Sequence, residues 1–223
     1  MRSKSSLNLV SMSLIRNIIW DFDGTLFDTY PALIHAFSRA LGDYGVQIPQ
    51  ELIVRHARLS LTLYGDELAK QYDLDPEEMQ QRILGYYASY PLGDQKPFPG
   101  VRQVCEYICS RGGANVIVTH RDADSARRLL KVYEMETYFA DLITTEGGYP
   151  LKPDPAMFEE VIRRCDLKLR ETLAVGDRDL DIQSGYAAGV HTCLFGPTTT
   201  EVEPDLRITS YKELLKYLQE LNN

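Results

Sequence analysis

The sequence predicts an α/β protein that has a doubly wound, Rossmann-like parallel sheet and a small all-α cap inserted after the first strand. Short apolar segments alternate with amphipathic helical segments over most of the 223 residues. Such alternation is typical of βαβ units and a parallel sheet. The alternation stops between about residues 30 and 93, where only helical patterns occur.

Five apolar segments are predicted to be the buried strands of this sheet. Each is short and ends in a polar cluster, as expected for strands that are covered on both faces. They cover residues 14–23, 114–120, 140–144, 172–177 and 190–195.

Amphipathic helices are predicted between and after these strands. They begin near Gly100, Asp122, Asp154, Asp179 and Ser210. Aspartate and serine are favoured at helix N-termini because their side chains accept hydrogen bonds from free backbone N–H groups.

The chain is expected to divide into a leader, a core and a cap. Residues 1–13 lack the sustained apolar run of a secretory signal and are expected to form a flexible leader. Residues 14–29 and 94–223 are expected to form the α/β core, and residues 30–93 the helical cap.

Charge and composition narrow the class of partner. The formal net charge of −8 argues against nucleic acid and anionic membranes, which attract basic patches. The four cysteines do not follow the spacing of a zinc site. A cytoplasmic protein that acts on a small molecule is therefore expected. The sequence leaves the oligomeric state open, and a monomer or weak homodimer is taken as the expectation.

Polar residues follow several of the predicted strands. In an open parallel sheet, functional residues collect beyond the carboxyl ends of the strands. The candidates are Asp21, Asp23, Thr119, His120, Arg121, Lys152, Asp177 and Asp181.

Four motifs that contain these residues resemble those of a known family. "DFDGT", "VIVTHRD", "LKPDP" and "VGDRDLDIQSGYAAG" occur in the order found in the haloacid dehalogenase-like phosphatases. The resemblance spans about residues 15–195. It is similar to the phosphoglycolate phosphatase and β-phosphoglucomutase group, which inserts a helical cap after the first motif.

The resemblance implies a role for each motif in phosphoryl transfer. Asp21 would be the nucleophile that forms an aspartyl-phosphate. Asp23 would protonate the leaving alkoxide and then activate water. Thr119 and Lys152 would hold the phosphoryl oxygens, and His120 and Arg121, which follow Thr119, would face the substrate.

The same resemblance implies a magnesium site. Two carboxylates at Asp21 and Asp23 disfavour each other's ionisation, and a divalent cation offsets this repulsion. Asp177 would add a second metal-binding carboxylate, with Asp181 binding directly or through water. Asp23 would contribute its backbone carbonyl, and ligands that are all oxygen suit Mg²⁺.

The expected function is thus Mg²⁺-dependent hydrolysis of a small phosphorylated metabolite that resembles phosphoglycolate or a sugar phosphate. A phosphomutase would share all four motifs and remains an alternative. A non-catalytic protein of the same fold is a second alternative, although such a protein should have lost one of Asp21, Asp23, Lys152 or Asp177. A haloacid dehalogenase is disfavoured, because those enzymes lack the aspartate found here at position 23.

Overall fold

The computed structural model describes residues 14–57 and 61–222, so the expected leader, 1–13, lies outside the described residues. The chain divides into two compact units, which are described separately. An α/β unit runs up to Leu26 and resumes at Phe98, and a helical unit spans Phe27–Pro97. The helical unit extends a few residues beyond the expected cap, 30–93, at both ends.

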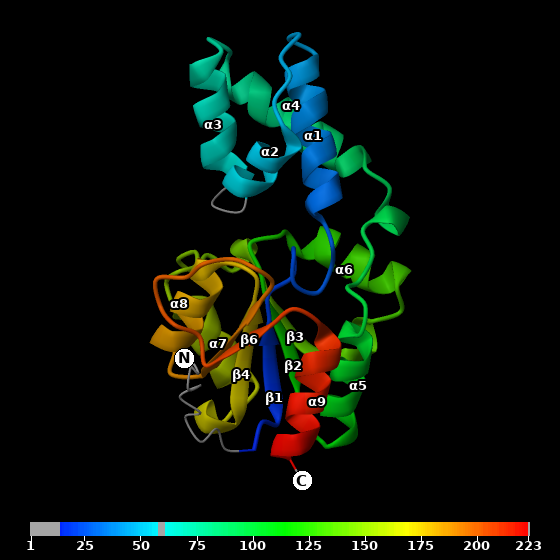
Figure 1. Cartoon of the computed structure of the whole chain (residues 1–223), viewed down its shortest axis with the longest axis vertical. Coiled ribbons are helices and arrows are strands. Elements are labelled where there is room, and N and C mark those ends of the chain that lie inside the picture. Colours follow the sequence, from blue (N-terminus) through cyan, green and yellow to red (C-terminus); the bar gives the residue numbers. More distant parts are fainter. Residues whose placement is uncertain (1–13, 58–60, 223) are drawn as a thin grey trace, which may run out of the picture. The chain divides into compact units, whose positions relative to one another are not determined.

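The α/β unit contains a parallel sheet, which has six strands among the described residues (Figure 1). The strands are β1 (Asn17–Trp20), β2 (Asn115–Val118), β3 (Phe139–Ile143), β4 (Thr172–Gly176), β5 (His191–Phe195) and β6 (Leu206–Ile208). Their order is β3-β2-β1-β4-β5-β6. The five predicted strands are all present. The sixth, β6, was not predicted because three residues are too few to show a hydrophobic pattern.

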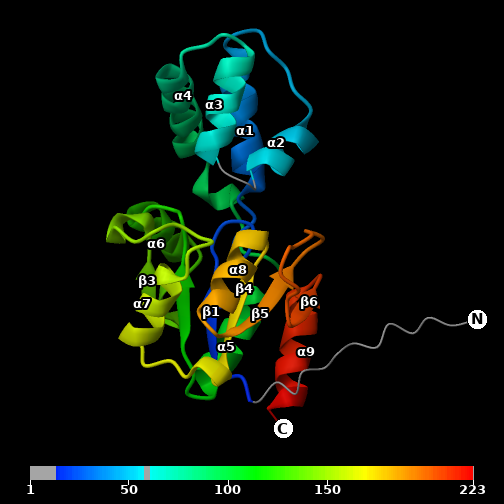
Figure 2. The same cartoon turned by 90° about the vertical axis from the view of Figure 1, so that its left-hand side faces the viewer.

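Helices cover both faces of this sheet, as predicted for the fold class. They are α5 (Val101–Ser110), α6 (Ala123–Val132), α7 (Ala156–Arg164), α8 (Asp179–Ala187) and α9 (Tyr211–Leu221), with short 3₁₀ turns at Glu136–Tyr138, Thr145–Gly147 and Leu169–Glu171. Helices α7 and α8 contact strands on one face, whereas α5 and α9 contact each other and strands β2 and β6 (Figure 2).

Strand β1 lies at the centre of the sheet and is buried on both faces. Ile19 packs with Met157 of α7 in one core cluster. The indole N–H of Trp20 donates to Oδ1 of Asn115 at 3.0 Å, and the Trp20 ring meets the edge of Tyr211, with centroids 5.7 Å apart. The strand order reverses at β1, between β2 and β4, and this is where open α/β sheets bind ligands.

The helical unit is built from four α-helices among its described residues. They are α1 (Tyr30–Gly42), α2 (Gln50–Ala57), α3 (Leu61–Gln71) and α4 (Pro76–Ser89), followed by a 3₁₀ turn at Leu92–Asp94. Leu33 and Phe37 of α1 share a core with Met79 and Ile83 of α4. Phe27 and Pro97, the first and last residues of this unit, pair with each other in an antiparallel bridge.

Candidate active site

The chain after β1 forms a tight, buried turn that fixes Asp21. The Asp21 N–H donates to the carbonyl of Val175 at 2.9 Å, which extends the pairing with β4. Gly24 has a φ of 78°, a conformation that favours glycine because other residues carry a Cβ. The Thr25 hydroxyl donates to Oδ2 of Asp21 at 3.2 Å, and the Tyr211 hydroxyl donates to the Thr25 carbonyl at 2.7 Å.

Three buried carboxylates, hereafter the acidic triad, meet at the carboxyl ends of β1 and β4. Asp21 follows β1, Asp177 follows β4, and Asp181 lies in the first turn of α8. One carboxylate oxygen of each lies within 4.8 Å of the others. Gly176 permits this approach, because a Cβ there would lie 2.2 Å from the Cβ of Asp181.

Lys152 bridges two members of the acidic triad from a third loop. Its Nζ lies 2.6 Å from Oδ1 of Asp21 and 2.8 Å from Oδ1 of Asp181, and its side chain is 0% exposed. A buried ammonium requires such partners, since an isolated charge is costly to remove from water. The bridge therefore ties the loop before α7 to the ends of β1 and α8.

A second cation, Arg178, lies beside the acidic triad. Its Nη2 is 3.5 Å from Oδ1 of Asp21, and its Nε is 3.6 Å from Oδ2 of Asp181 and 4.0 Å from Oδ1 of Asp177. These separations are longer than those of Lys152. The triad thus has two positive side chains against its three carboxylates.

Burial and neighbouring charges act in opposite directions on the triad. Burial is the largest influence on the pKa of Asp21 and raises it, and the charge of Asp181 adds to this effect. Burial also pushes the pKa of Asp181 upward, but Lys152 and Arg178 together outweigh it and hold that pKa below its usual value. Of these two carboxylates, Asp21 is therefore the one that gains a proton first when no metal is bound.

Asp23 lies apart from the triad and pairs with Arg121. Oδ1 of Asp23 accepts a hydrogen bond from Nη1 of Arg121 at 2.7 Å, and the Asp23 side chain is 29% exposed. Arg121 is buried, its Nε donates to Oγ of Ser125 at 2.8 Å, and its guanidinium lies 5.4 Å from the centroid of the Phe22 ring. The pair fixes where the Asp23 carboxylate points.

Thr119 and His120 directly follow strand β2 and contact other parts of the site. The Thr119 hydroxyl accepts the backbone N–H of Arg121 at 3.0 Å. Nε2 of His120 accepts the backbone N–H of Lys152 at 2.9 Å. Burial, followed by the charges of Lys152 and Arg178, lowers the pKa of His120 to about 4. His120 is therefore neutral near pH 7 and orients the loop that carries Lys152.

A family model described as haloacid dehalogenase-like hydrolase matches residues 18–195, a stretch that contains every candidate residue above. The chain belongs to the haloacid dehalogenase-like hydrolase family. The predicted family is confirmed, and with it the prediction of an enzyme of this hydrolase class.

Named relatives and a solved structure resemble this hydrolase over most of its length. A pyrophosphatase PpaX of Halalkalibacterium halodurans is 26% identical and covers 90% of this chain and 95% of its own. A phosphoglycolate phosphatase of Aliivibrio fischeri is 26% identical and covers 92% and 96%. The structure of a putative β-phosphoglucomutase from Thermotoga maritima has a TM-score of 0.77 at 20% identity, covers 93% and 100%, and confirms the predicted fold.

The hydrolase brings together most, but not all, of the side chains singled out in its sequence. Asp21, Lys152, Asp177 and Asp181 meet directly. The carboxylate of Asp23 is instead held by Arg121. Asp179, which was predicted only as the start of a helix, is the first residue of α8, and its carboxylate accepts hydrogen bonds from the Gln183 side chain and the Glu201 N–H.

Sequence reasoning did not single out Arg178, Ser125 or Tyr211. Arg178 was detectable in principle, because it is a basic residue between two aspartates directly after a buried strand. Tyr211 was not, since it begins the last helix, 186 positions from the residue whose carbonyl it binds. Only folding brings such residues together.

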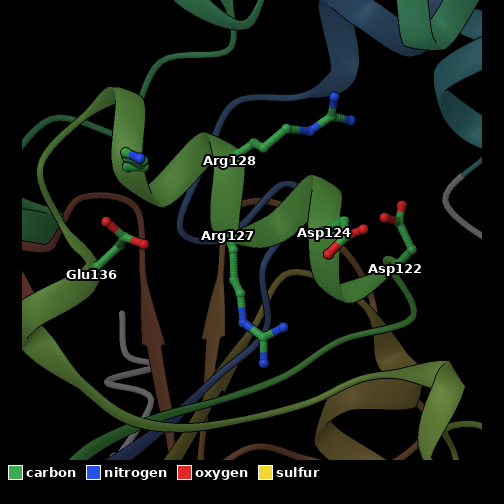
Figure 3. A pocket seen from close by; sticks show the side chains of 6 residues that line it. Asp122, Asp124, Arg127, Arg128 and Glu136 are labelled. Carbon is green, nitrogen blue, oxygen red and sulfur yellow. The ribbon is translucent and has the colours of Figure 1, made fainter.

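A separate surface pocket of about 470 Å³ lies along α6 and is lined by charges of both signs (Figure 3). Its lining residues are Asp122, Asp124, Arg127, Arg128, Lys131 and Glu136. Arg127 and Arg128 extend in different directions, so their guanidinium groups do not converge on one point (Figure 3). Asp122 caps α6 by accepting a hydrogen bond from the N–H of Ser125 at 2.8 Å.

Within the described residues, no helix is long and apolar enough to cross a bilayer.

Proposed function

We propose that this hydrolase is a Mg²⁺-dependent phosphatase that releases phosphate from a small phosphorylated metabolite through an aspartyl-phosphate intermediate. The observation that carries the proposal is the position of Lys152, whose Nζ bridges Asp21 and Asp181. One ammonium thus contacts both the expected nucleophile and a second carboxylate of the acidic triad. This arrangement suits a site that receives a doubly charged phosphoryl group.

Asp21 is assigned the role of nucleophile. Its carboxylate attacks phosphorus, the bond to the leaving alkoxide breaks, and an aspartyl-phosphate forms. Water then attacks that phosphorus and releases inorganic phosphate and free Asp21. The hydrogen bond from Thr25 and the contact with Lys152 hold the Asp21 carboxylate in one orientation.

Asp23 is assigned the role of general acid and base. It gives a proton to the leaving alkoxide in the first step and takes one from the attacking water in the second. Its partly exposed carboxylate can exchange protons with solvent, whereas the triad is buried. Arg121 orients this carboxylate through the 2.7 Å contact.

Thr119 and Lys152 are assigned to the phosphoryl oxygens, with donors that stabilise the negative charge in the transition state. His120 and Arg121 were expected to face the substrate. His120 accepts a hydrogen bond from the Lys152 N–H, and Arg121 donates one to the Asp23 carboxylate, so each orients a residue with an assigned role. Direct substrate contact by either residue stays a prediction.

The acidic triad fits a magnesium ion. Three buried carboxylates with oxygens within 4.8 Å offer the all-oxygen donor set that Mg²⁺ prefers. We assign binding to Asp21, Asp177 and Asp181, together with the backbone carbonyl of Asp23. A bound Mg²⁺ supplies charge neutralisation for the carboxylates and the phosphoryl oxygens.

We assign substrate selection to the expected cap, residues 30–93. We also propose that the enzyme works in the cytoplasm and that it is a monomer or weak homodimer. Nucleic acid and membranes are not proposed as partners. The pyrophosphatase and phosphoglycolate phosphatase names of the relatives suggest a substrate with a second anionic group close to its phosphate. Phosphoglycolate, pyrophosphate and sugar phosphates therefore head the list of substrates to test.

The proposal is tested by measuring phosphate release from these compounds with and without Mg²⁺. We expect release that requires Mg²⁺ and falls by about a thousandfold or more in Asp21→Asn, since nucleophile removal has effects of that order. Asp124→Asn, an exposed change on α6, is the matched control and should retain activity. Transfer of labelled phosphate between two hydroxyls of one sugar, without free phosphate, would instead identify a phosphomutase. Equal activity of Asp21→Asn and the wild type would contradict both.

A further inference from the structure

Arg178 is a cation that the catalytic roles above leave without a function. It lies between Asp177 and Asp179, immediately before α8, and its side chain is 16% exposed. Its guanidinium lies within 4.0 Å of all three members of the acidic triad. A positive charge at this point acts directly on the groups assigned to the metal.

The contacts of Arg178 differ from those of Lys152 in both length and burial. Lys152 is fully buried and lies 2.6 and 2.8 Å from its two carboxylates. The separations of Arg178 are 3.5 to 4.0 Å, longer than those of a good charged hydrogen bond. Lys152 therefore pairs closely with two carboxylates, whereas the guanidinium of Arg178 acts on all three at a longer distance.

We propose that Arg178 tunes the site by competing with Mg²⁺ for the acidic triad and by attracting the phosphoryl group to Asp21. This inference rests on the proposed function, because it concerns the same metal and the same nucleophile. Arg178 is assigned no proton transfer. It sets how tightly the site holds the cation and the anion.

The two effects have opposite signs. A guanidinium beside the triad repels a divalent cation and so weakens Mg²⁺ binding, whereas the same charge favours a phosphate dianion. A phosphoryl group attacked by Asp21 must approach within about 3 to 3.5 Å of that carboxylate, and Nη2 of Arg178 already lies 3.5 Å from Asp21 Oδ1. Arginine stays protonated at any working pH, so this contribution is constant.

Direct binding measurements on the full-length protein test the inference. Mg²⁺ is titrated into metal-free protein by calorimetry and by fluorescence of Trp20, the single tryptophan, which precedes Asp21 in the buried strand. Inorganic phosphate is then titrated at saturating Mg²⁺. For Arg178→Gln we expect the Kd for Mg²⁺ to fall about tenfold, the effect of one unit charge about 6 Å from a divalent ion in a water-like dielectric. The Kd for phosphate should rise by a similar or smaller factor.

Two further variants serve as controls. Arg178→Lys keeps the charge and should return both constants toward those of the wild type. Arg16→Gln removes an equal charge before the amino end of β1, where Arg16 pairs with Glu171, and should change neither constant. Thermal unfolding of each variant verifies that it is folded.

The outcomes separate this inference from the proposed function. If the wild type binds Mg²⁺ and Arg178→Gln binds it equally or more weakly, the inference is overturned and the proposed function stands. An unchanged phosphate Kd in Arg178→Gln also overturns it. If the wild type binds no Mg²⁺, the proposed function fails first, and the inference fails with it.

Discussion

Nη1 of Arg121 lies 2.7 Å from Oδ1 of Asp23. Arg121 is two positions after Thr119 and Asp23 is two positions after Asp21, so this ion pair links the segment after β2 to the segment after β1. Arg121 is itself fixed by Ser125 and by the ring of Phe22. The carboxylate assigned to proton transfer is thus oriented by a buried cation from a different strand end. Its proton-transfer geometry depends on that cation.

Replacement of Arg121 by glutamine should impair hydrolysis most where the leaving group needs a proton. We expect about a tenfold to hundredfold loss of kcat with an alkyl phosphate, because a misaligned acid loses much of the usual contribution of general acid catalysis. Loss with p-nitrophenyl phosphate should be much smaller, since nitrophenolate leaves without protonation. Asp23→Asn should show the same pattern, and Arg127→Gln on α6 serves as control. Equal losses with both substrates would show that Arg121 does not act through Asp23.

Replacement of Lys152 by methionine should destabilise the fold, because it leaves Asp21 and Asp181 buried without their shared ammonium. Breaking a buried ion pair from one side typically costs about 3 to 5 kcal/mol. Added Mg²⁺ should recover part of this loss by replacing the missing positive charge. Urea unfolding with and without Mg²⁺ measures both effects. Lys168→Met, at an exposed pair with Glu171, should cost little, and a Lys152→Met protein as stable as the wild type would refute the expectation.

Replacement of Gly176 by alanine should displace Asp181, since the new Cβ would lie 2.2 Å from the Cβ of Asp181. We expect a destabilisation of about 1 to 3 kcal/mol from overpacking and weaker Mg²⁺ binding in calorimetry. Gly85→Ala in α4 is the matched control, because a Cβ there meets nothing within 4 Å. Unchanged metal affinity in Gly176→Ala would mean that Asp181 does not need its present position to bind Mg²⁺.

Replacement of His120 by asparagine should reduce the dependence of stability on pH. The His120 pKa is about 4 in the folded protein, against a usual 6.5. Between these values the unfolded chain binds more protons, so stability rises with pH across this window and falls as pH drops from about 6.5 to about 4. Asparagine carries an amide oxygen that can accept a hydrogen bond, but it does not titrate. Urea unfolding at pH 5 and pH 7 should therefore differ less in the variant, and an identical difference would contradict the assignment.

Much of the fold could be predicted because its signals are local. The apolar segments at 114–120 and 172–177 are buried strands β2 and β4, as their composition indicates. Asp122 caps α6, as a polar residue before an amphipathic segment should. Local patterns did not separate residues 49–72 into the two helices α2 and α3. They also misplaced the start of α7 by one residue, since Pro155 rather than Asp154 occupies the N-cap position.

The amino-acid sequence was enough to predict five of the six strands and their helices along the chain, the helical insertion, and the four motifs that carry the acidic and basic residues. Hydrophobic periodicity records which residues face a core, and parallel strands place their carboxyl ends at one edge. Only the tertiary structure decided which side chains meet there. Lys152 joins Asp21 to Asp181, Arg121 holds Asp23, and Arg178 lies beside the triad. These pairings depend on loop paths and on hydrogen-bond distances of a few ångströms, which periodicity in the sequence does not encode.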